Sequence, residues 1–284
     1  MELTANEIRR AVRAALAEDL GRGDVTTLAT VPATAKSIAR MNAREPMAVA
    51  GLEFAICAFR QLSSNIQIKA LACDGQRVEA GQTLLEISGY SRAILSAERV
   101  ALNFIQRLSG VATATAQFAD RVKNTGAKIL DTRKTTPGWR RFEKYAVWCG
   151  GGKNHRIGLF DMVLIKDNHL VAVRHEKPNA IAASVARARK KYPKLKVEVE
   201  ADTLEQVAQA AAAGADIILL DNMPPAQLRR AVKIVNRRAQ TEASGGVNLK
   251  TISAIAKTGV NFISVGAITH SARAVDIGLD FVNR

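Results

Sequence analysis

The chain has 284 residues, of which 48% are hydrophobic and 24% charged, so it can bury a substantial core and has the composition of an ordinary globular protein. Its formal net charge of +15 leaves three classes of partner open, namely nucleic acid, an anionic membrane surface and polyanionic small molecules. No window of about 18 consecutive apolar residues predicts a membrane span and the first residues lack a signal-peptide pattern, so we expect a soluble, cytoplasmic protein.

The three cysteines, Cys57, Cys73 and Cys149, are odd in number and show no CxxC spacing. This pattern argues against a disulfide framework and against a zinc site. We therefore expect reduced thiols.

The first hundred residues predict a mixture of antiparallel strands and helices. Residues 4–17 repeat apolar side chains at helical spacing, with Thr4 and Glu7 placed to form a capping box. The next segment, GRGDVTT (21–27), predicts a solvated loop. The remaining elements expected here are strands at 36–43, 47–50 and 66–70, a strand-turn-strand unit within 74–89, and helices at 52–62 and 92–108.

From about Gly110 onward, helix and strand alternate regularly. After a helix at 112–123, we predict strands at 128–130, 162–165, 196–199, 216–220, 241–243 and 261–265, and alanine-rich helices at 180–191, 203–213, 225–238 and 249–257. Such a βα series closes parallel strands into a sheet or barrel. Because a complete eight-unit barrel takes about 250 residues, we predict an incomplete barrel of six or seven strands.

Polar or small residues follow every predicted strand of this series. In βα barrels the C-terminal strand ends carry the active site, so these residues are expected to converge. The residues in question are Asp131, Thr132, Arg133 and Lys134, then Lys166 and Asp167, Glu198 and Glu200, Asp221 and Asn222, Ser244 to Gly246, and Gly266 with Ala267.

The segment 131–170 has a positive surplus that predicts an anionic ligand. Its cations Arg140, Arg141, Lys144, Lys153, His155 and Arg156 have only Glu143 and Asp161 as nearby counter-charges.

Glu198 and Glu200 lie two apart on one predicted strand, so both side chains should point into the barrel. Lys134 and Lys166 would supply balancing cations, and Asp221 on the next strand could share a divalent ion with Glu200. Mg²⁺ suits such a site because it is usually held by one or two carboxylates and substrate phosphates. The alternative is a salt-bridge network without metal. We expect Glu200 to lie nearer the ligand than Glu198.

Small residues in the last two strand-end loops predict a phosphate site. EASGGVN (242–248) and SVGAITHS (264–271) free backbone N–H groups for close approach to a ligand. The loops after the last strands of such barrels commonly bind phosphate.

Several long motifs, in this order, closely resemble the quinolinate phosphoribosyltransferase family, and the resemblance covers essentially the whole chain. They are GRGDVTT (21–27), SAERVALNFIQRLSG (96–110), DTRKTTPG (131–138), CGGGKNHRIGL (149–159), LIKDNH (164–169), VEVEA (197–201), ADIILLDNM (215–223), EASGGV (242–247) and ISVGAITHS (263–271). The resemblance implies an N-terminal α/β sandwich at 1–110, a partial α/β barrel at 111–270, and a tail at 271–284 that packs back on the N-terminal domain. It also implies a homodimer that completes the site across its interface.

The activity implied by the resemblance is phosphoribosyl transfer from phosphoribosyl pyrophosphate to quinolinate, with Mg²⁺, to give nicotinate mononucleotide, pyrophosphate and CO₂ in NAD biosynthesis. Matched residue by residue, Arg133, His155, Arg156 and Lys166 would bind the quinolinate carboxylates, with Arg99 contributed by the partner subunit. Lys134, Lys166, Glu200 and Asp221 would be catalytic, with Glu200 and Asp221 on the metal. The remaining substrate contacts would be Thr132, Ser244, Gly245, Gly246, Val265, Gly266, Ala267 and His270, several of them on the 5-phosphate.

Two rival functions remain open at this point. A related phosphoribosyltransferase could act on another pyridine or pyrimidine acid, although the cluster of Arg133, His155 and Arg156 suits a second carboxylate. A nucleic-acid-binding protein would explain the net charge, but aromatic residues make up only 5% of the chain and the basic residues follow no single stripe.

Overall fold

The computed structural model describes residues 2–282, which divide into two compact units. The first unit combines the described residues up to Ala116 with Thr136–Gly151 and with the segment from Ser271 onward. The second unit consists of Gln117–Thr135 and Gly152–His270. Within residues 2–282, no helix is both long and apolar enough to cross a membrane.

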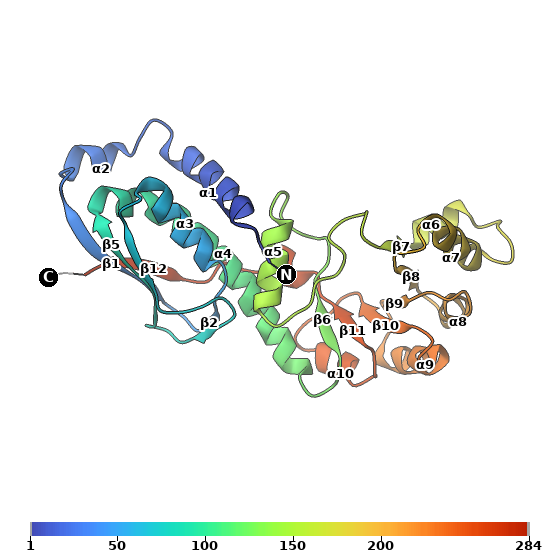
Figure 1. Ribbon diagram of the computed structural model, residues 1–284. Helices are drawn as coiled ribbons and strands as arrows, with labels where there is room; N and C mark the ends of the chain where they lie inside the picture. Colours follow the sequence, from blue (N-terminus) through green and yellow to red (C-terminus); the bar gives the residue numbers. More distant parts are fainter. Residues whose placement is uncertain (1, 283–284) are drawn as a thin grey trace. The chain divides into compact units, whose positions relative to one another are not determined.

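The first unit is built on antiparallel strands with helices beside them (Figure 1). Its elements are α1 (Ala5–Leu20), α2 (Val25–Thr30), β1 (Lys36–Ala43), β2 (Met47–Ala48), α3 (Leu52–Leu62), β3 (Gln67–Ala70), β4 (Arg77–Val78), β5 (Thr83–Tyr90), α4 (Ser91–Val122, whose end lies in the second unit), α5 (Arg140–Cys149) and β12 (Ile277–Phe281). One sheet has the order β12-β1-β5-β3, and β2 pairs with β4. The C-terminal segment therefore adds a strand beside β1, which is the packing expected for it.

Aromatic packing explains why Thr136–Gly151 belongs to the first unit, whereas the sequence placed it in the barrel domain. Phe54 of α3 stacks on Phe104 of α4 with ring centroids 4.9 Å apart, and it meets Phe142 of α5 edge-on at 5.0 Å. Trp139 stacks on the same Phe104 at 4.9 Å. Burial of these rings ties α5 to the core of the first unit.

The prediction of two helices at 92–108 and 112–123 was wrong, because α4 runs without a break through Gly110. A Cβ at Gly110 would collide with the carbonyl oxygen of Arg273, so the glycine permits close packing of the C-terminal segment.

Two local expectations in the first unit also need correction. The segment 21–27 is only partly a loop, since Asp24 accepts a hydrogen bond from the Thr27 backbone N–H at 2.9 Å and begins α2. Within 74–89, β4 pairs with β2 and not with β5, because β5 is taken up between β1 and β3.

The second unit is a six-stranded parallel sheet, which confirms the predicted incomplete barrel. Its elements are β6 (Lys128–Leu130), β7 (Val163–Ile165), α6 (Asp167–Ala172), α7 (Ala180–Lys191), β8 (Val197–Ala201), α8 (Leu204–Ala212), β9 (Ile217–Asp221), α9 (Pro225–Val235), β10 (Gln240–Ser244), α10 (Ile252–Ala256), β11 (Phe262–Ser264) and α11 (Ala267–His270). The order is β6-β11-β10-β9-β8-β7, and neighbouring strands are parallel. Figure 1 shows α8 and α9 alongside these strands.

Lys153 forms an additional parallel bridge with Leu130 at the free edge of β6. The Lys153 N–H donates to Ile129 O at 2.8 Å, and the Asp131 N–H donates to Lys153 O at 3.2 Å. The chain after α5 is thereby fixed beside the end of β6, where the predicted site begins.

Candidate active site

One cavity of about 820 Å³ lies at the C-terminal ends of the parallel strands. It is lined by Thr132, Arg133, Lys134, His155, Arg156, Leu164, Lys166, Glu200, Leu219, Asp221, Asn222, Glu242, Ser244, Gly245, Gly246, Val247, Ser264, Val265, Gly266, Ala267 and His270. The structure thus brings together every site residue predicted from the sequence except Arg99. Arg99 lies exposed on α4 of the first unit and does not line this cavity.

The residues after β6 are held in a fixed turn. Thr132 Oγ1 accepts a hydrogen bond from the Lys134 N–H at 3.1 Å, and Thr269 Oγ1 donates to the Lys134 carbonyl oxygen at 2.8 Å. These contacts position the backbone from which Arg133 and Lys134 enter the cavity.

A basic loop, which we define as residues 153–162, supplies the other arginine. Asp161 accepts hydrogen bonds from the Ile157 and Gly158 backbone N–H groups at 2.8 and 2.9 Å and closes this loop. The pKa of Arg156 is lowered by burial and by the nearby charge of Arg133. Both arginines line the cavity, and like charges in one pocket are expected of a site for more than one anionic group.

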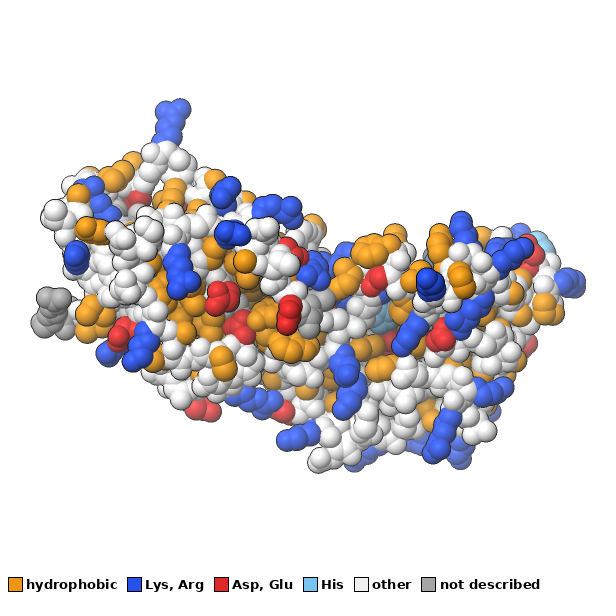
Figure 2. Space-filling model, in the orientation of Figure 1, with side chains coloured by type: hydrophobic (Ala, Val, Ile, Leu, Met, Phe, Trp, Pro, Cys, Tyr) orange, Lys and Arg blue, Asp and Glu red, His pale blue; other side chains and the backbone are white. Residues whose placement is uncertain are grey.

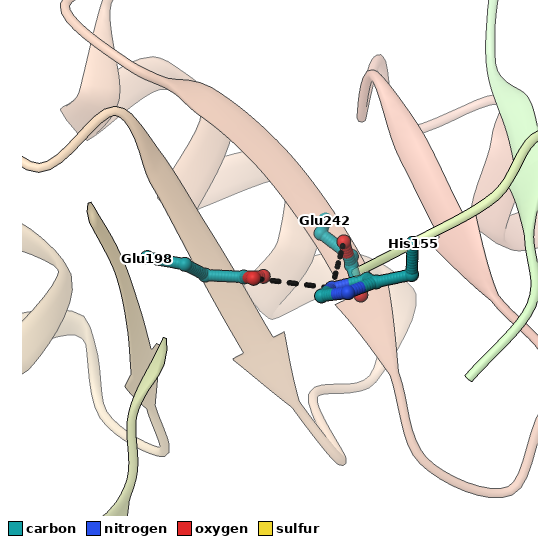
Figure 3. A group of neighbouring side chains, drawn as sticks. All are labelled: His155, Glu198 and Glu242. Carbon is teal, nitrogen blue, oxygen red and sulfur yellow. Dashed lines mark ion pairs between the residues drawn. The ribbon is translucent and has the colours of Figure 1, made fainter. Parts of the chain in front are cut away.

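His155 belongs to a buried group with two glutamates (Figure 3). Its Nε2 lies 3.1 Å from Glu198 Oε2 and 3.5 Å from Glu242 Oε2. Lys134 and Lys166 were expected to balance Glu198, but its partner is His155, and Lys166 pairs with Glu200. Glu200 lines the cavity and Glu198 does not. That Glu200 lies nearer a ligand stays a prediction.

Protons, rather than a metal ion, fit the group around His155. Burial lowers the pKa of His155, but Glu198 and Glu242 outweigh burial and raise it to about 10. Burial and Glu242 raise the pKa of Glu198 to about 7 against the opposing effect of His155. His155 Nδ1 lies 2.8 Å from the Arg156 backbone nitrogen. The raised pKa keeps a proton on Nε2, which points toward Glu198, so Nε2 is a donor and not a metal ligand.

Glu200 and Asp221 form the acidic side of the cavity. Lys166 Nζ lies 3.4 Å from Glu200 Oε2. Burial raises the pKa of Glu200, the charge of Lys166 lowers it, and the charge of Asp221 raises it. These two carboxylates line the cavity and are hard oxygen donors, so they could hold Mg²⁺ together with a substrate phosphate.

The opposite side of the cavity is a backbone cradle. Gly245 and Gly246 have φ angles of +94° and +59°, which favour glycine. A Cβ at Gly245 would collide with the Asn222 side chain, and one at Gly266 would lie 3.1 Å from His270 Nε2. The cradle therefore depends on the absence of side chains at these positions.

The sequence placed Asp131 and Asn222 at strand ends but gave no role to either, and Glu242 was missed. Glu242 lies two residues before Ser244 on β10, and the same period-two spacing that singled out Glu198 and Glu200 could have found it.

Comparison with known proteins agrees with this geometry. Residues 24–109 match the family model "Quinolinate phosphoribosyl transferase, N-terminal domain", and residues 111–280 match the model of the C-terminal domain. The chain is 44% identical over 278 residues to the nicotinate-nucleotide pyrophosphorylase [carboxylating] of Mycobacterium leprae, covering 96% of each chain. It is 42% identical to the Bacillus subtilis protein named "Probable nicotinate-nucleotide pyrophosphorylase [carboxylating]", covering 93% of this chain and 89% of that protein.

A solved structure of a similar protein has the same fold. The nicotinate-nucleotide pyrophosphorylase of Francisella tularensis superposes with a TM-score of 0.93 at 44% identity, covering 99% of this chain and 98% of that chain.

Proposed function

The chain belongs to the quinolinate phosphoribosyltransferase family, and from this premise we propose how the cavity at its strand ends carries out the family reaction. The protein is a pentosyltransferase of NAD biosynthesis, which joins quinolinate to phosphoribosyl pyrophosphate and releases pyrophosphate and CO₂ to give nicotinate mononucleotide. The observation that supports the assignment of roles most strongly is that cations, acids and the glycine cradle all line one cavity.

Arg133, Arg156 and Lys166 bind the two carboxylates of quinolinate in this proposal. Arginine forks suit carboxylates because they donate two parallel hydrogen bonds. The repulsion between Arg133 and Arg156 is relieved when a dianion enters. His155 lies against the same pocket wall, with Nε2 turned toward Glu198 and Glu242.

The phosphoribosyl group occupies the other side of the cavity. Ser244, Gly245 and Gly246 and the turn Val265, Gly266 and Ala267 hold the 5-phosphate, with Thr132 and His270 beside it. Lys134, Glu200 and Asp221 face the ribose and pyrophosphate. Mg²⁺ bound by Glu200 and Asp221 would neutralise charge on the pyrophosphate.

The chemistry follows from these positions. The pyridine nitrogen attacks the sugar carbon as its bond to pyrophosphate breaks, and the positive charge that develops on the sugar is stabilised by Glu200 and Asp221. Lys134 and Lys166 balance the negative charge of the departing group. The alkylated ring nitrogen is cationic, so the ring accepts the electron pair left when the carboxylate beside the nitrogen departs as CO₂. A proton then replaces the carboxylate on that ring carbon.

We also propose that a homodimer completes the site, with Arg99 contributed by the second subunit. Mixing two inactive variants tests this directly. If Arg99→Ala and Arg133→Ala homodimers are dissociated and reassociated together, a mixed dimer contains one intact site, and activity should return to about a quarter of normal. Mixtures that stay inactive would place Arg99 outside the shared site.

Substrate choice separates this function from that of a related enzyme acting on a monocarboxylate. Arg133→Ala should lose quinolinate turnover by at least about a hundredfold, because a charge-assisted bidentate pair is lost, while its thermal unfolding stays near normal. Near-normal turnover would remove Arg133 from the site. Exchange of exposed Arg187 for alanine is the matched control.

The high net charge gives no support to a nucleic-acid-binding function. On the face that Figure 2 shows, lysine and arginine side chains are scattered among other residues and form no single stripe. A salt-sensitive shift on DNA that phosphoribosyl pyrophosphate does not affect would favour that rival. Unpaired cysteines support a cytoplasmic location, which we propose as well.

A further inference from the structure

Asp131 connects the two segments that carry the arginines of the cavity. It is the first residue after β6, it is completely buried, and Thr132 and Arg133 follow it directly. Its Oδ1 accepts the His155 backbone N–H at 2.9 Å, and its Oδ2 accepts the Asn154 side-chain N–H at 2.7 Å. One buried carboxylate thus ties the strand end that bears Arg133 to the basic loop that bears Arg156.

These segments need such a tie because their arginines repel each other. Both arginines line the same cavity, and burial and the charge of Arg133 lower the pKa of Arg156. Repulsion between like charges would drive the basic loop away from β6. Instead, His155, the residue next to Arg156, is held by the hydrogen bond from its backbone N–H to Asp131. Lys153 adds two backbone hydrogen bonds to the edge of β6.

We propose that Asp131 is a positioning residue that sets the separation of Arg133 and Arg156, and with it the preference of the site for two adjacent carboxylates. The inference rests on the proposed function of this cavity. Asp131 acts through the backbone of His155 and the side chain of Asn154, and it does not touch the substrate.

Two variants test the proposal. Asp131→Asn replaces one acceptor oxygen by an NH₂ group that cannot accept either hydrogen bond. Asn154→Ala removes one of the two bonds without changing any charge, so it separates geometry from electrostatics. We expect the KM for quinolinate to rise about tenfold or more in Asp131→Asn, because an NH₂ group then faces a donor and the negative charge is lost, and about threefold in Asn154→Ala, because one hydrogen bond is lost. The KM for phosphoribosyl pyrophosphate should stay within twofold in both.

A second readout is competition by pyridine-3-carboxylate, which has a single carboxylate. Its inhibition constant should change less than twofold in both variants, because it needs only one arginine. A loss of general stability would not produce this selectivity.

Asp216→Asn is the matched control in the same unit. Asp216 is also an aspartate that accepts a backbone N–H, from Val197 at 2.7 Å, and it pairs with Arg189 at 2.7 Å away from the cavity. The Asp216→Asn substitution should lower thermal stability without changing the KM for quinolinate or for phosphoribosyl pyrophosphate.

The outcomes distinguish failure of the proposed function from failure of the inference about Asp131. If the unsubstituted protein makes no nicotinate mononucleotide, the proposed function fails. If it does, and both KM values for quinolinate remain normal or fall, Asp131 is a structural residue and the inference is overturned. If Asp131→Asn does not fold, Asn154→Ala decides.

Discussion

Lys166 Nζ lies 3.4 Å from Glu200 Oε2, which links the C-terminal ends of β7 and β8 inside the cavity. The two residues come from strands that are paired in register from Val163 with Val197 to Ile165 with Val199. The distance is therefore set by the sheet, and a cation and an acid are placed side by side for a substrate that carries both positive and negative charge during the reaction.

Glu200→Gln should reduce kcat about a hundredfold with a smaller effect on the KM values. The carboxylate stabilises positive charge that develops only in the transition state, and removing one such group typically costs about 10² to 10³ in kcat. Steady-state rates with both substrates varied provide the measurement. Glu205→Gln, on the exposed surface of α8, should leave kcat unchanged, whereas a Glu200 variant with normal kcat would exclude the assigned role.

Gly245→Ala should raise the KM for phosphoribosyl pyrophosphate about tenfold or more and leave the KM for quinolinate nearly unchanged. Gly245 has φ +94°, and a Cβ there would collide with Asn222 at the edge of the cradle. Backbone strain of this kind costs about 1–3 kcal/mol. Gly81→Ala is the control, since Gly81 has φ +87° with open space around it. Equal effects of the two variants on KM would contradict a phosphate site at Gly245.

Glu143→Gln should destabilise the protein by about 3 kcal/mol, because it breaks a buried ion pair from one side. Glu143 is fully buried, lies 2.6 Å from Arg107 Nη2, and accepts hydrogen bonds from the Thr136 backbone N–H and hydroxyl. Urea unfolding gives the free energy. Glu86→Gln, which breaks the exposed pair with Arg40, should cost no more than about 1 kcal/mol. A Glu143 variant as stable as the Glu86 variant would show that the buried pair is unimportant.

Glu7 should contribute to stability in a pH-dependent way. A hydrogen bond from Arg141, followed by one from the Thr4 backbone, lowers the pKa of Glu7 from 4.5 to about 2. Because the pKa is lower in the folded state, the contribution is complete above about pH 4.5 and is lost as the pH falls toward 2. The difference in unfolding free energy between the unsubstituted protein and Glu7→Gln should therefore be larger at about pH 7 than at about pH 2.5. Arg141→Gln should show the same trend, and a difference independent of pH would contradict it.

The barrel strands were predictable because most are short apolar runs followed by a polar or small residue. Residues 128–130 of β6 were placed without error, and most other ends agreed within about one or two residues. The capping box of Thr4 and Glu7 was also read from the sequence and is present. Local patterns of this kind require no knowledge of distant contacts.

Features that depend on distant partners were not predictable. Gly110 has the appearance of a helix end until the carbonyl of Arg273 is seen against it. Nothing near Glu198 in the sequence indicates that His155 is its partner. Likewise, Asp131 has no visible role until the fold brings the backbone of His155 to its carboxylate. Residues that line the cavity were predictable because strand ends converge, whereas the contacts that support them were not.

The most direct test of the whole account is the formation of nicotinate mononucleotide by the purified protein, with quinolinate, phosphoribosyl pyrophosphate and Mg²⁺ omitted one at a time. We expect product, with an equal amount of CO₂ and pyrophosphate, only when all three are present. Product formed from nicotinate at a comparable rate, or no product from the complete mixture, would contradict the assignment of this cavity to quinolinate.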